Sequence, residues 1–357
     1  MPRKPKNSAP AAPPELQANR PVSLKDLAAY LGLSRSTVSL VLNNSPVAQG
    51  LAPQTRERIL LAAKKMGYRP NYFARMLNNK RSFMVGIMSP DLAEGYDSEI
   101  LNGIELTLNE KDYLYFVSSH HWNSERIVKR MDEFTARGAE GFILINTPVE
   151  RTTHLPIVTI GPSGSGASYT RILVDNRHGI QLSIDHLHGL GHRDIAFFRG
   201  HQNSSDTEAR WKATMEMAQQ YGINMEHELQ VQLERVDNGL NPVQEGYMAC
   251  EKLLARKRKF TALMAFNDMT AIGALRCLRD HKYEIPGQVS IMGFDDVLAA
   301  SMIEPTLTTI RQPLAAMGRM AATKIMDLIQ NPEMAPEQIE IKPELVVRKS
   351  TGPVATA

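Results

Sequence analysis

The chain has 357 residues, 43% hydrophobic and 22% charged, which is too long for one average domain and enough to bury a sizeable core. No apolar run approaches the ~18–20 residues of a membrane span, and residues 1–21 lack the apolar stretch of an export signal, so we expect a cytoplasmic protein with a disordered Pro/Ala-rich start. The net charge of +3 is unevenly distributed along the chain. Residues 1–81 carry 14 Lys and Arg against 3 Asp and Glu, a net charge of +11, so the remaining residues carry a net charge of −8. A basic head on an acidic body is typical of a protein whose head alone meets a polyanion.

The first predicted element is a helix that starts after Ser23 and ends at Gly32. Ser23 and Asp26 have the spacing of a capping box, and one face is apolar at helical spacing: Leu24, Leu27, Ala28 and Leu31. A second helix follows, with Ser34 as its cap and Asn43 at its end. Its inward positions are Val38, Val41 and Leu42. Two short helices joined by a tight glycine turn predict a helix-turn-helix unit.

A third helix is predicted from Pro53 to Gly67, with its core positions at Ile59, Leu60, Ala63 and Met66. In such a unit the second helix enters the major groove, and its N-terminal side chains face base edges. Arg35 can donate two hydrogen bonds to a guanine, whereas Ser36 is shorter and less selective. The other polar side chains are expected on phosphates: Ser23, Ser34, Thr37, Ser39 and Asn43. By itself, a three-helix unit could also be an ordinary protein-interaction bundle.

Residues 71–81 follow the head and span only two helical turns behind an Asn cap. An isolated helix of this length is marginal in water, so we expect it to stay disordered until something orders it.

From Phe83 onward, short apolar runs alternate with segments of helical periodicity, and this alternation restarts once. The runs predict buried parallel strands at residues 84–88, 113–117, 141–145, 157–160, 195–198, 262–266 and 289–294. The predicted fold class is therefore a helical head followed by two doubly wound α/β lobes, with ligand-facing loops at the carboxyl ends of the strands.

Other motifs favour structural roles. Cys250 and Cys277 lie in segments that read as amphipathic helices, and we expect both to be small buried residues without a disulfide. The histidines of residues 185–192 fit a helix end and a turn better than a metal site. Residues 161–166 lack the Lys-Ser/Thr ending of a phosphate loop and are expected to form a flexible loop. We expect no catalytic site, no metal and no cofactor.

Three stretches of the head, residues 24–28, 32–43 and 67–71, resemble the head of the LacI/GalR (lactose-repressor) family in order and spacing. The body resembles the type I periplasmic-binding-protein fold that this family uses, so the resemblance extends from residue 22 to about residue 350. Leu40 departs from the pattern, because many members carry a base-reading arginine there; specificity would shift to Arg35 or to apolar contact with a thymine methyl. The segment 44–51 is longer than the family's usual loop.

The resemblance implies that residues 71–81 become a hinge helix in the minor groove, paired with the same helix of a second subunit. Leu77 would wedge into the central base step and bend the duplex, and further DNA contacts are implied for Tyr72, Ala74 and Asn78. The alternative for Leu77 is ordinary packing on Phe73 in a linker.

The resemblance also implies a ligand cleft between the lobes, formed by Tyr96, Asp97, Asp206, Arg210, Asn267 and Asp295. A charged pair with amides can clamp the hydroxyls of a sugar or the polar edge of a base, and a sugar or sugar derivative is the family's commonest effector. For Asp175, Asp268 and Asp296 we expect structural roles, such as capping and hinge hydrogen bonds.

The expected protein is a homodimeric transcriptional repressor whose binding to a pseudo-palindromic operator is controlled allosterically by a small molecule. Its expected parts are a tail (1–21), a helix-turn-helix domain (22–70), a hinge (71–82) and an effector-binding and dimerisation domain (83–350). In the last, one lobe comprises about 83–180 and 312–340, and the other about 181–311 and 341–350. The alternatives are a solute-binding receptor without DNA function, which would need an export signal, and a non-specific nucleoid protein.

Overall fold

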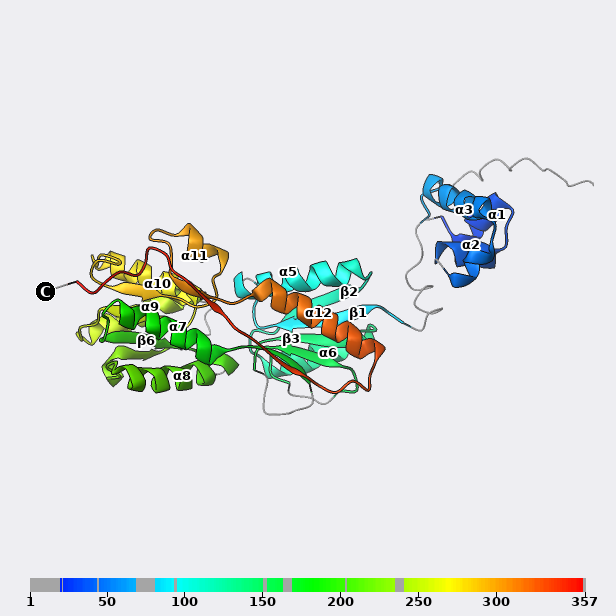
Figure 1. Ribbon diagram of the computed structural model, residues 1–357. Helices are drawn as coiled ribbons and strands as arrows, with labels where there is room; N and C mark the ends of the chain where they lie inside the picture. Colours follow the sequence, from blue (N-terminus) through cyan, green and yellow to red (C-terminus); the bar gives the residue numbers. More distant parts are fainter. Residues whose placement is uncertain are drawn as a thin grey trace, which may run out of the picture. The chain divides into compact units, whose positions relative to one another are not determined.

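Figure 1 shows the computed structural model, which describes residues 20, 22–43, 45–68, 81–92, 95–149, 153–162, 169–202, 204–234 and 241–355. The chain divides into a head, residues 1–81, and a body, residues 82–357. The predicted hinge, residues 71–82, lies outside the described residues except for Arg81 and Ser82, and so does most of the predicted flexible loop at residues 161–166. Within the described ranges, no helix has both the length and the apolar character that a membrane crossing requires.

Where the structure describes the head, it contains three helices and one 3₁₀ turn, namely α1 (Leu24–Leu31), α2 (Arg35–Leu42), η1 (Pro46–Gly50) and α3 (Pro53–Lys65). The predicted capping box is confirmed, because Ser23 Oγ accepts from Asp26 N at 3.3 Å while the Asp26 carboxylate accepts from Ser23 N at 3.0 Å. Gly32 ends α1 at a φ of +64°, a value that favours glycine. Ser34 caps α2 by accepting from Thr37 N at 3.1 Å. Local capping therefore sets the ends of the first two helices.

The head core centres on Leu27, Val38 and Ile59, one fully buried residue from each helix. The prediction that Leu60 belongs to this core is wrong, since its side chain is 53% exposed. Residues 59–61 are three adjacent apolar residues, and the sequence does not show which of them faces the core. Only one face of α3 can pack against so small a core, and that face carries Ile59, Ala62 and Ala63. The longer loop forms η1, which buries Ala48 against the same core.

The first lobe of the body contains a six-stranded parallel sheet in the order β11-β5-β4-β3-β1-β2. Its strands are β1 (Met84–Ser89), β2 (Leu114–Ser119), β3 (Gly141–Ile145), β4 (Ile157–Ile160), β5 (Thr170–Val174) and β11 (Gln338–Ile341). Alternate residues of β3 face opposite sides. Ile143 and Ile145 pack with α5 (Gly95–Glu110) and α12 (Leu314–Gln330), whereas Phe142 and Leu144 pack with α6 (Ser124–Ala136).

The second lobe contains a four-stranded parallel sheet in the order β7-β6-β8-β9. Its strands are β6 (Ile195–Arg199), β7 (Gln230–Gln232), β8 (Ala262–Met264) and β9 (Ser290–Met292). Two helices pack against each face (Figure 1): α7 (Asn176–Gly189) with α8 (Ser205–Tyr221), and α9 (Pro242–Ala255) with α10 (Asp268–Asp280). The predicted fold class, a helical head with a two-lobed α/β body, is confirmed.

Every predicted apolar run contains a parallel strand, but one of them is not buried. The run at 113–117 forms β2 at the sheet edge, where Leu114 and Val117 are 49% and 38% exposed. These residues are exposed because β2 is an edge strand, and its position depends on the order of strands in the whole sheet. The short strands β5, β7 and β11 were not predicted.

Three segments join the two lobes: β5 to α7, β9 to α12, and β11 to β12 (Glu344–Val346). The second segment includes α11 (Leu298–Met302) and β10 (Thr309–Arg311), and β10 pairs antiparallel with β12. Asp296 accepts from Arg311 Nε at 2.7 Å and from Arg348 Nη2 at 2.6 Å, so it ties the crossing segments together.

Helices α9 and α10 touch through their backbones. A Cβ at Gly246 would lie 2.1 Å from the Thr270 carbonyl oxygen. We expect Gly246→Ala to lower the free energy of unfolding of the body by about 1–3 kcal/mol, because a backbone atom cannot move aside cheaply. Urea unfolding followed by circular dichroism measures this. The control is Gly189→Ala on α7, where nothing lies within 4 Å and helix propensity predicts a gain of up to ~1 kcal/mol. Equal effects at both sites would contradict the close contact.

Candidate DNA-binding helix and ligand cleft

The first turn of α2 presents polar side chains to solvent. Ser34, Arg35 and Ser36 are all exposed, with Arg35 as the first residue of the helix. No acidic residue lies in the first turn, so the positive helix terminus and the guanidinium act together on an approaching anion. This is the arrangement that base recognition by Arg35 requires.

Several of the predicted phosphate contacts already have hydrogen-bond partners within the head. Ser23 Oγ donates to Asp26 at 2.7 Å, the Ser34 and Thr37 hydroxyls share a hydrogen bond of 2.8 Å, and Asn43 Nδ2 donates to Ser39 Oγ at 3.0 Å. The first contact lies at the start of α1, and the other two orient side chains along α2. Leu40 is half-buried and packs against the head core. The hinge positions Tyr72, Ala74, Leu77 and Asn78 lie outside the described residues.

In the body, a buried network surrounds Arg210. This residue of α8 is 7% exposed; its Nε donates to Asn176 Oδ1 at 2.9 Å and its Nη1 donates to the Phe266 carbonyl oxygen at 2.9 Å. Asn176 Nδ2 in turn donates to Asp206 Oδ1 at 2.8 Å. The guanidinium carbon lies 3.9 Å from the ring centroid of Phe294. The arginine is therefore held in one orientation by hydrogen bonds and an aromatic face.

Asp295 lies near this arginine on the segment after β9. Its carboxylate accepts from Gln312 Nε2 at 2.6 Å, and its φ of +124° is a conformation that favours glycine. Its backbone N–H donates to Ile310 at 2.8 Å, which helps to hold that conformation. Burial raises the pKa of Asp295 well above its usual value; the Arg210 charge opposes this shift and the Asp268 charge adds to it.

Tyr96 of the first lobe lies near Arg210 and Asp295 of the second lobe. Burial raises the pKa of Tyr96 well above its usual value, and the charges of Asp206 and Asp295 raise it further, whereas Arg210 lowers it. A residue at the start of α5 thus lies within electrostatic reach of three groups of the second lobe. Its neighbour Asp97 is buried in the first turn of α5.

The remaining expected cleft residue, Asn267, has a capping role. Its Oδ1 accepts from Thr270 N at 2.9 Å at the start of α10, directly after Phe266, whose carbonyl oxygen binds Arg210. The structure thus gathers Tyr96, Asp206, Arg210 and Asp295, and places Asn267 next to them in the chain.

The three aspartates expected to be structural make structural contacts. Asp175 caps α7 by accepting from His178 N at 2.8 Å, and Asp268 accepts from Val297 N at 2.9 Å. Asp296 forms the two arginine pairs between the crossing segments. Burial raises the pKa of Asp268 to about 6, as expected for a carboxylate surrounded by protein.

Sequence reasoning missed two residues of the network, Asn176 and Gln312. Asn176 follows β5, a strand that was not predicted, and Gln312 follows β10, another such strand. The signal for Asn176 was a polar pair after the apolar residues 172–174, the position where parallel sheets place ligand-binding groups.

The hollow around Arg210 is small, about 30 Å³, and is lined by residues of the second lobe, including Phe198, Trp211 and Phe294. A larger hollow of about 330 Å³ lies farther out, where Trp122 of the first lobe faces His201 and Gln232 of the second. The inner hollow is therefore lined mostly by aromatic and apolar side chains around the Arg210 guanidinium, and the outer hollow mostly by polar side chains.

The head has the arrangement by which a helix reads the major groove, and the body has the polar cleft of a small-molecule receptor. Together they define a ligand-responsive DNA-binding regulator. Comparison with known proteins agrees in both parts. Residues 23–71 match the model of the bacterial regulatory proteins of the lacI family, and residues 184–351 match the periplasmic binding protein-like domain. The chain belongs to the LacI family and is a transcriptional regulator.

Individual relatives match over nearly the whole chain. The probable HTH-type transcriptional repressor ExuR of Bacillus subtilis is 27% identical over 94% of this chain and all of the relative. A structure of the regulator CelR with cellobiose is 25% identical, with a TM-score of 0.68 over 92% of this chain and 99% of that one. The lac repressor dimer bound to operator and the anti-inducer ONPF is 24% identical, with a TM-score of 0.81 over 93% of this chain and all of that one.

Proposed function

We propose that this protein is a cytoplasmic, nucleoid-associated repressor that binds a pseudo-palindromic operator as a homodimer and responds to a sugar or sugar derivative in the cleft at Arg210. The observation that carries the proposal is the buried Arg210–Asn176–Asp206 network, which Tyr96 of the other lobe approaches. Buried charges are retained where a polar ligand uses them. The cellobiose in the CelR structure supports a carbohydrate effector.

The size of the cleft supports an allosteric mechanism. A hollow of about 30 Å³ holds roughly one water molecule, so a metabolite that reaches Arg210 needs the groups around the arginine to move apart, and Tyr96 of the other lobe is near them. A ligand that binds one lobe arrangement better than the other shifts the population between them. The coupling to DNA affinity is reciprocal and typically ~1–3 kcal/mol.

Exposed apolar side chains on three elements of the body indicate the homodimer surface. They come from α5, the edge strand β2 and α11, and are Leu106, Leu114, Val117, Leu298 and Met302. The starts of α5 and α11 adjoin, since a Cβ at Gly95 would lie 3.2 Å from Val297 Cβ. The surface thus spans both lobes, and apolar patches of this kind mark interfaces. We propose that the second subunit covers it.

We expect the double substitution Leu298→Asp and Met302→Asp to convert the dimer into a monomer. The two side chains are 67% and 75% exposed, so the variant should still fold, while two carboxylates facing their symmetry mates oppose pairing. Sedimentation velocity across a protein dilution series measures the mass. The matched control is Met215→Asp, an exposed methionine of α8, and α8 lies on a different side of the body from α11 (Figure 1); this variant should remain dimeric.

The whole proposal is tested by selecting genomic fragments with the purified protein and by screening carbohydrates and nucleobases for thermal stabilisation, with and without the selected DNA. We expect a two-fold-symmetric site, and a ligand whose stabilising effect changes when DNA is present. Binding with a steep salt dependence and no sequence preference would instead identify a non-specific nucleoid protein. Ligand binding without any DNA binding would identify a solute receptor.

A further inference from the structure

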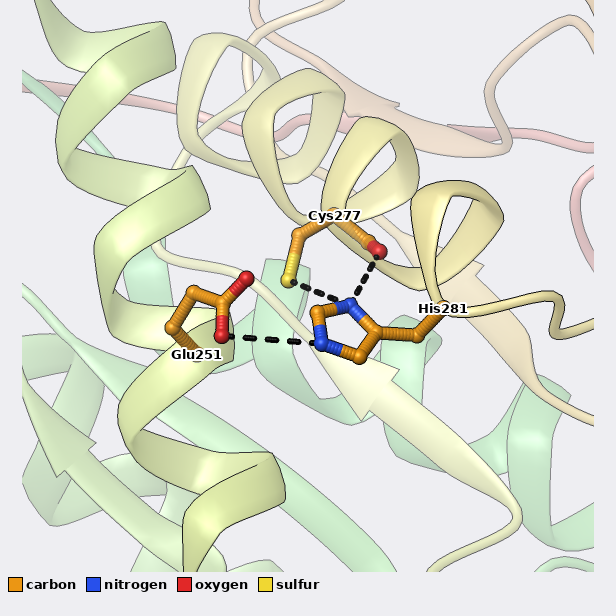
Figure 2. Close-up of side chains that lie close together, drawn as sticks. All are labelled: Glu251, Cys277 and His281. Atoms are coloured by element: carbon orange, nitrogen blue, oxygen red, sulfur yellow. Dashed lines mark hydrogen bonds and ion pairs between the residues drawn. The ribbon is translucent and has the colours of Figure 1, made fainter.

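Three side chains with metal-binding atoms meet on the second lobe, between α9 and α10 (Figure 2). Cys277 and His281 belong to α10 and its C-terminal cap, and Glu251 belongs to α9. One donor atom from each lies within 4.8 Å of the other two. Cys277 is fully buried, whereas the side chains of His281 and Glu251 are 41% and 45% exposed. The cluster therefore opens to solvent on one side only.

The spacing along α10 explains why two of these groups meet. Residues four apart lie on the same face of a helix, and Cys277 and His281 have this spacing. Figure 2 shows the imidazole beside both the thiol and the carboxylate, with Sγ 3.9 Å from Nδ1 and Glu251 Oε2 3.6 Å from Nε2. Glu251 comes from the adjoining helix, which the Gly246 contact holds close.

The hydrogen bond of His281 prepares its other nitrogen for coordination. Nδ1 lies 3.0 Å from the Cys277 carbonyl oxygen, which can only accept, so Nδ1 carries the proton. In the neutral ring, Nε2 then keeps its lone pair and points toward Glu251. A histidine that ligates a metal through one nitrogen commonly donates from the other to a carbonyl in this way.

We propose that Cys277, His281 and Glu251 form a Zn²⁺ site that links α9 to α10. Thiolate, imidazole and carboxylate are the donors that zinc prefers, and bond lengths of ~2.0–2.3 Å in a tetrahedron place donor atoms roughly 3.5 Å apart. The donor atoms lie within 4.8 Å of one another, so the exposed Glu251 and His281 side chains need to move inward to reach that spacing. Zinc replaces the thiol proton of Cys277, which is released to solvent, and a water molecule completes the tetrahedron.

The proposed site is separate from the ligand cleft. Asn267 caps the start of α10 beside the cleft, whereas His281 caps the other end of the same helix. Thirteen helical residues separate them, a length of about 20 Å. Bound zinc would fix α10 against α9 and thereby stiffen the helix that begins at the ligand cleft.

Co²⁺ added to the metal-free full-length protein tests the site, because a cobalt–thiolate bond gives a near-ultraviolet charge-transfer band and tetrahedral Co²⁺ gives visible bands. We expect one Co²⁺ per chain with both signals, and their loss when Zn²⁺ displaces cobalt. His281→Ala should weaken Co²⁺ binding by at least about tenfold, and Glu251→Gln should also weaken it. Both side chains are at the surface, so these variants should fold normally.

His154→Ala is the matched control, an exposed histidine on the first lobe, and should bind Co²⁺ as the parent does. Cys250, the chain's other thiol, hydrogen-bonds to Cys277, so Cys250→Ser should keep the thiolate band and Cys277→Ser should lose it. Absence of a thiolate band in the parent protein, or equal affinity in His281→Ala and His154→Ala, would leave only a surface ion pair beside a buried thiol and overturn the proposal.

Discussion

Replacing Arg210 with glutamine is expected to abolish the response to the effector while operator binding by the ligand-free protein persists. The guanidinium donates to Asn176 and to the Phe266 carbonyl oxygen and packs on Phe294, so it is oriented before any ligand arrives. Losing one partner of a buried charged contact costs about 2–4 kcal/mol, or roughly 30- to 700-fold in affinity. Calorimetry with the ligand found by thermal screening measures the change.

Two comparisons make this result specific. Arg126→Gln removes an exposed arginine on α6 and should leave ligand affinity unchanged. Unfolding by urea shows whether Arg210→Gln has damaged the second lobe, since the substitution also removes two internal hydrogen bonds. A stable Arg210→Gln protein with parental ligand affinity would show that the ligand binds elsewhere.

The second large effect is expected from Arg35→Ala at the start of α2. If Arg35 binds a guanine edge, its loss removes about 1–3 kcal/mol of discrimination at one base position in each half-site, and a symmetric dimer suffers this twice. Binding to a library of operators with every base substituted should show relaxed preference at that position alone.

The control for Arg35 is Lys25→Ala, an exposed cation on α1 outside the first turn of α2. It should preserve the sequence preference, whatever it does to overall affinity. An unchanged base profile in Arg35→Ala would mean that other residues, such as Ser36 or Leu40, read the sequence.

The head could be predicted from sequence in detail because the ends of its helices are set by contacts between residues close together in the chain. Ser23, Gly32 and Ser34 begin or end helices through contacts within three or four residues, and such contacts are visible in the order of residues. The prediction for Leu60 was wrong because its burial depends on how α3 packs on the other helices, and adjacent apolar residues cannot all face one small core. Unbroken apolar strands were also predictable, whereas β5 and β10 combine polar with apolar residues and so give no clear pattern.

The ligand cleft was predicted only in part, and the reason is distance along the chain. Resemblance to a family indicated Arg210 and Asp295, but their partners Asn176 and Gln312 lie 34 and 17 residues away. Likewise, Cys277 and His281 share a helix, while Glu251 reaches them from another helix. The approach of Tyr96 to the second lobe depends on how three crossing segments bend.

The sequence alone determined the helix-turn-helix and the two α/β lobes, because helix caps, apolar periodicity and charge act over a few residues, and its resemblance to the LacI/GalR family indicated the class of regulator. Only the tertiary structure decided which strand lies at the edge, which leucines face solvent and which polar groups meet. Those outcomes depend on contacts between segments far apart in the chain, where burial and hydrogen bonding are settled jointly.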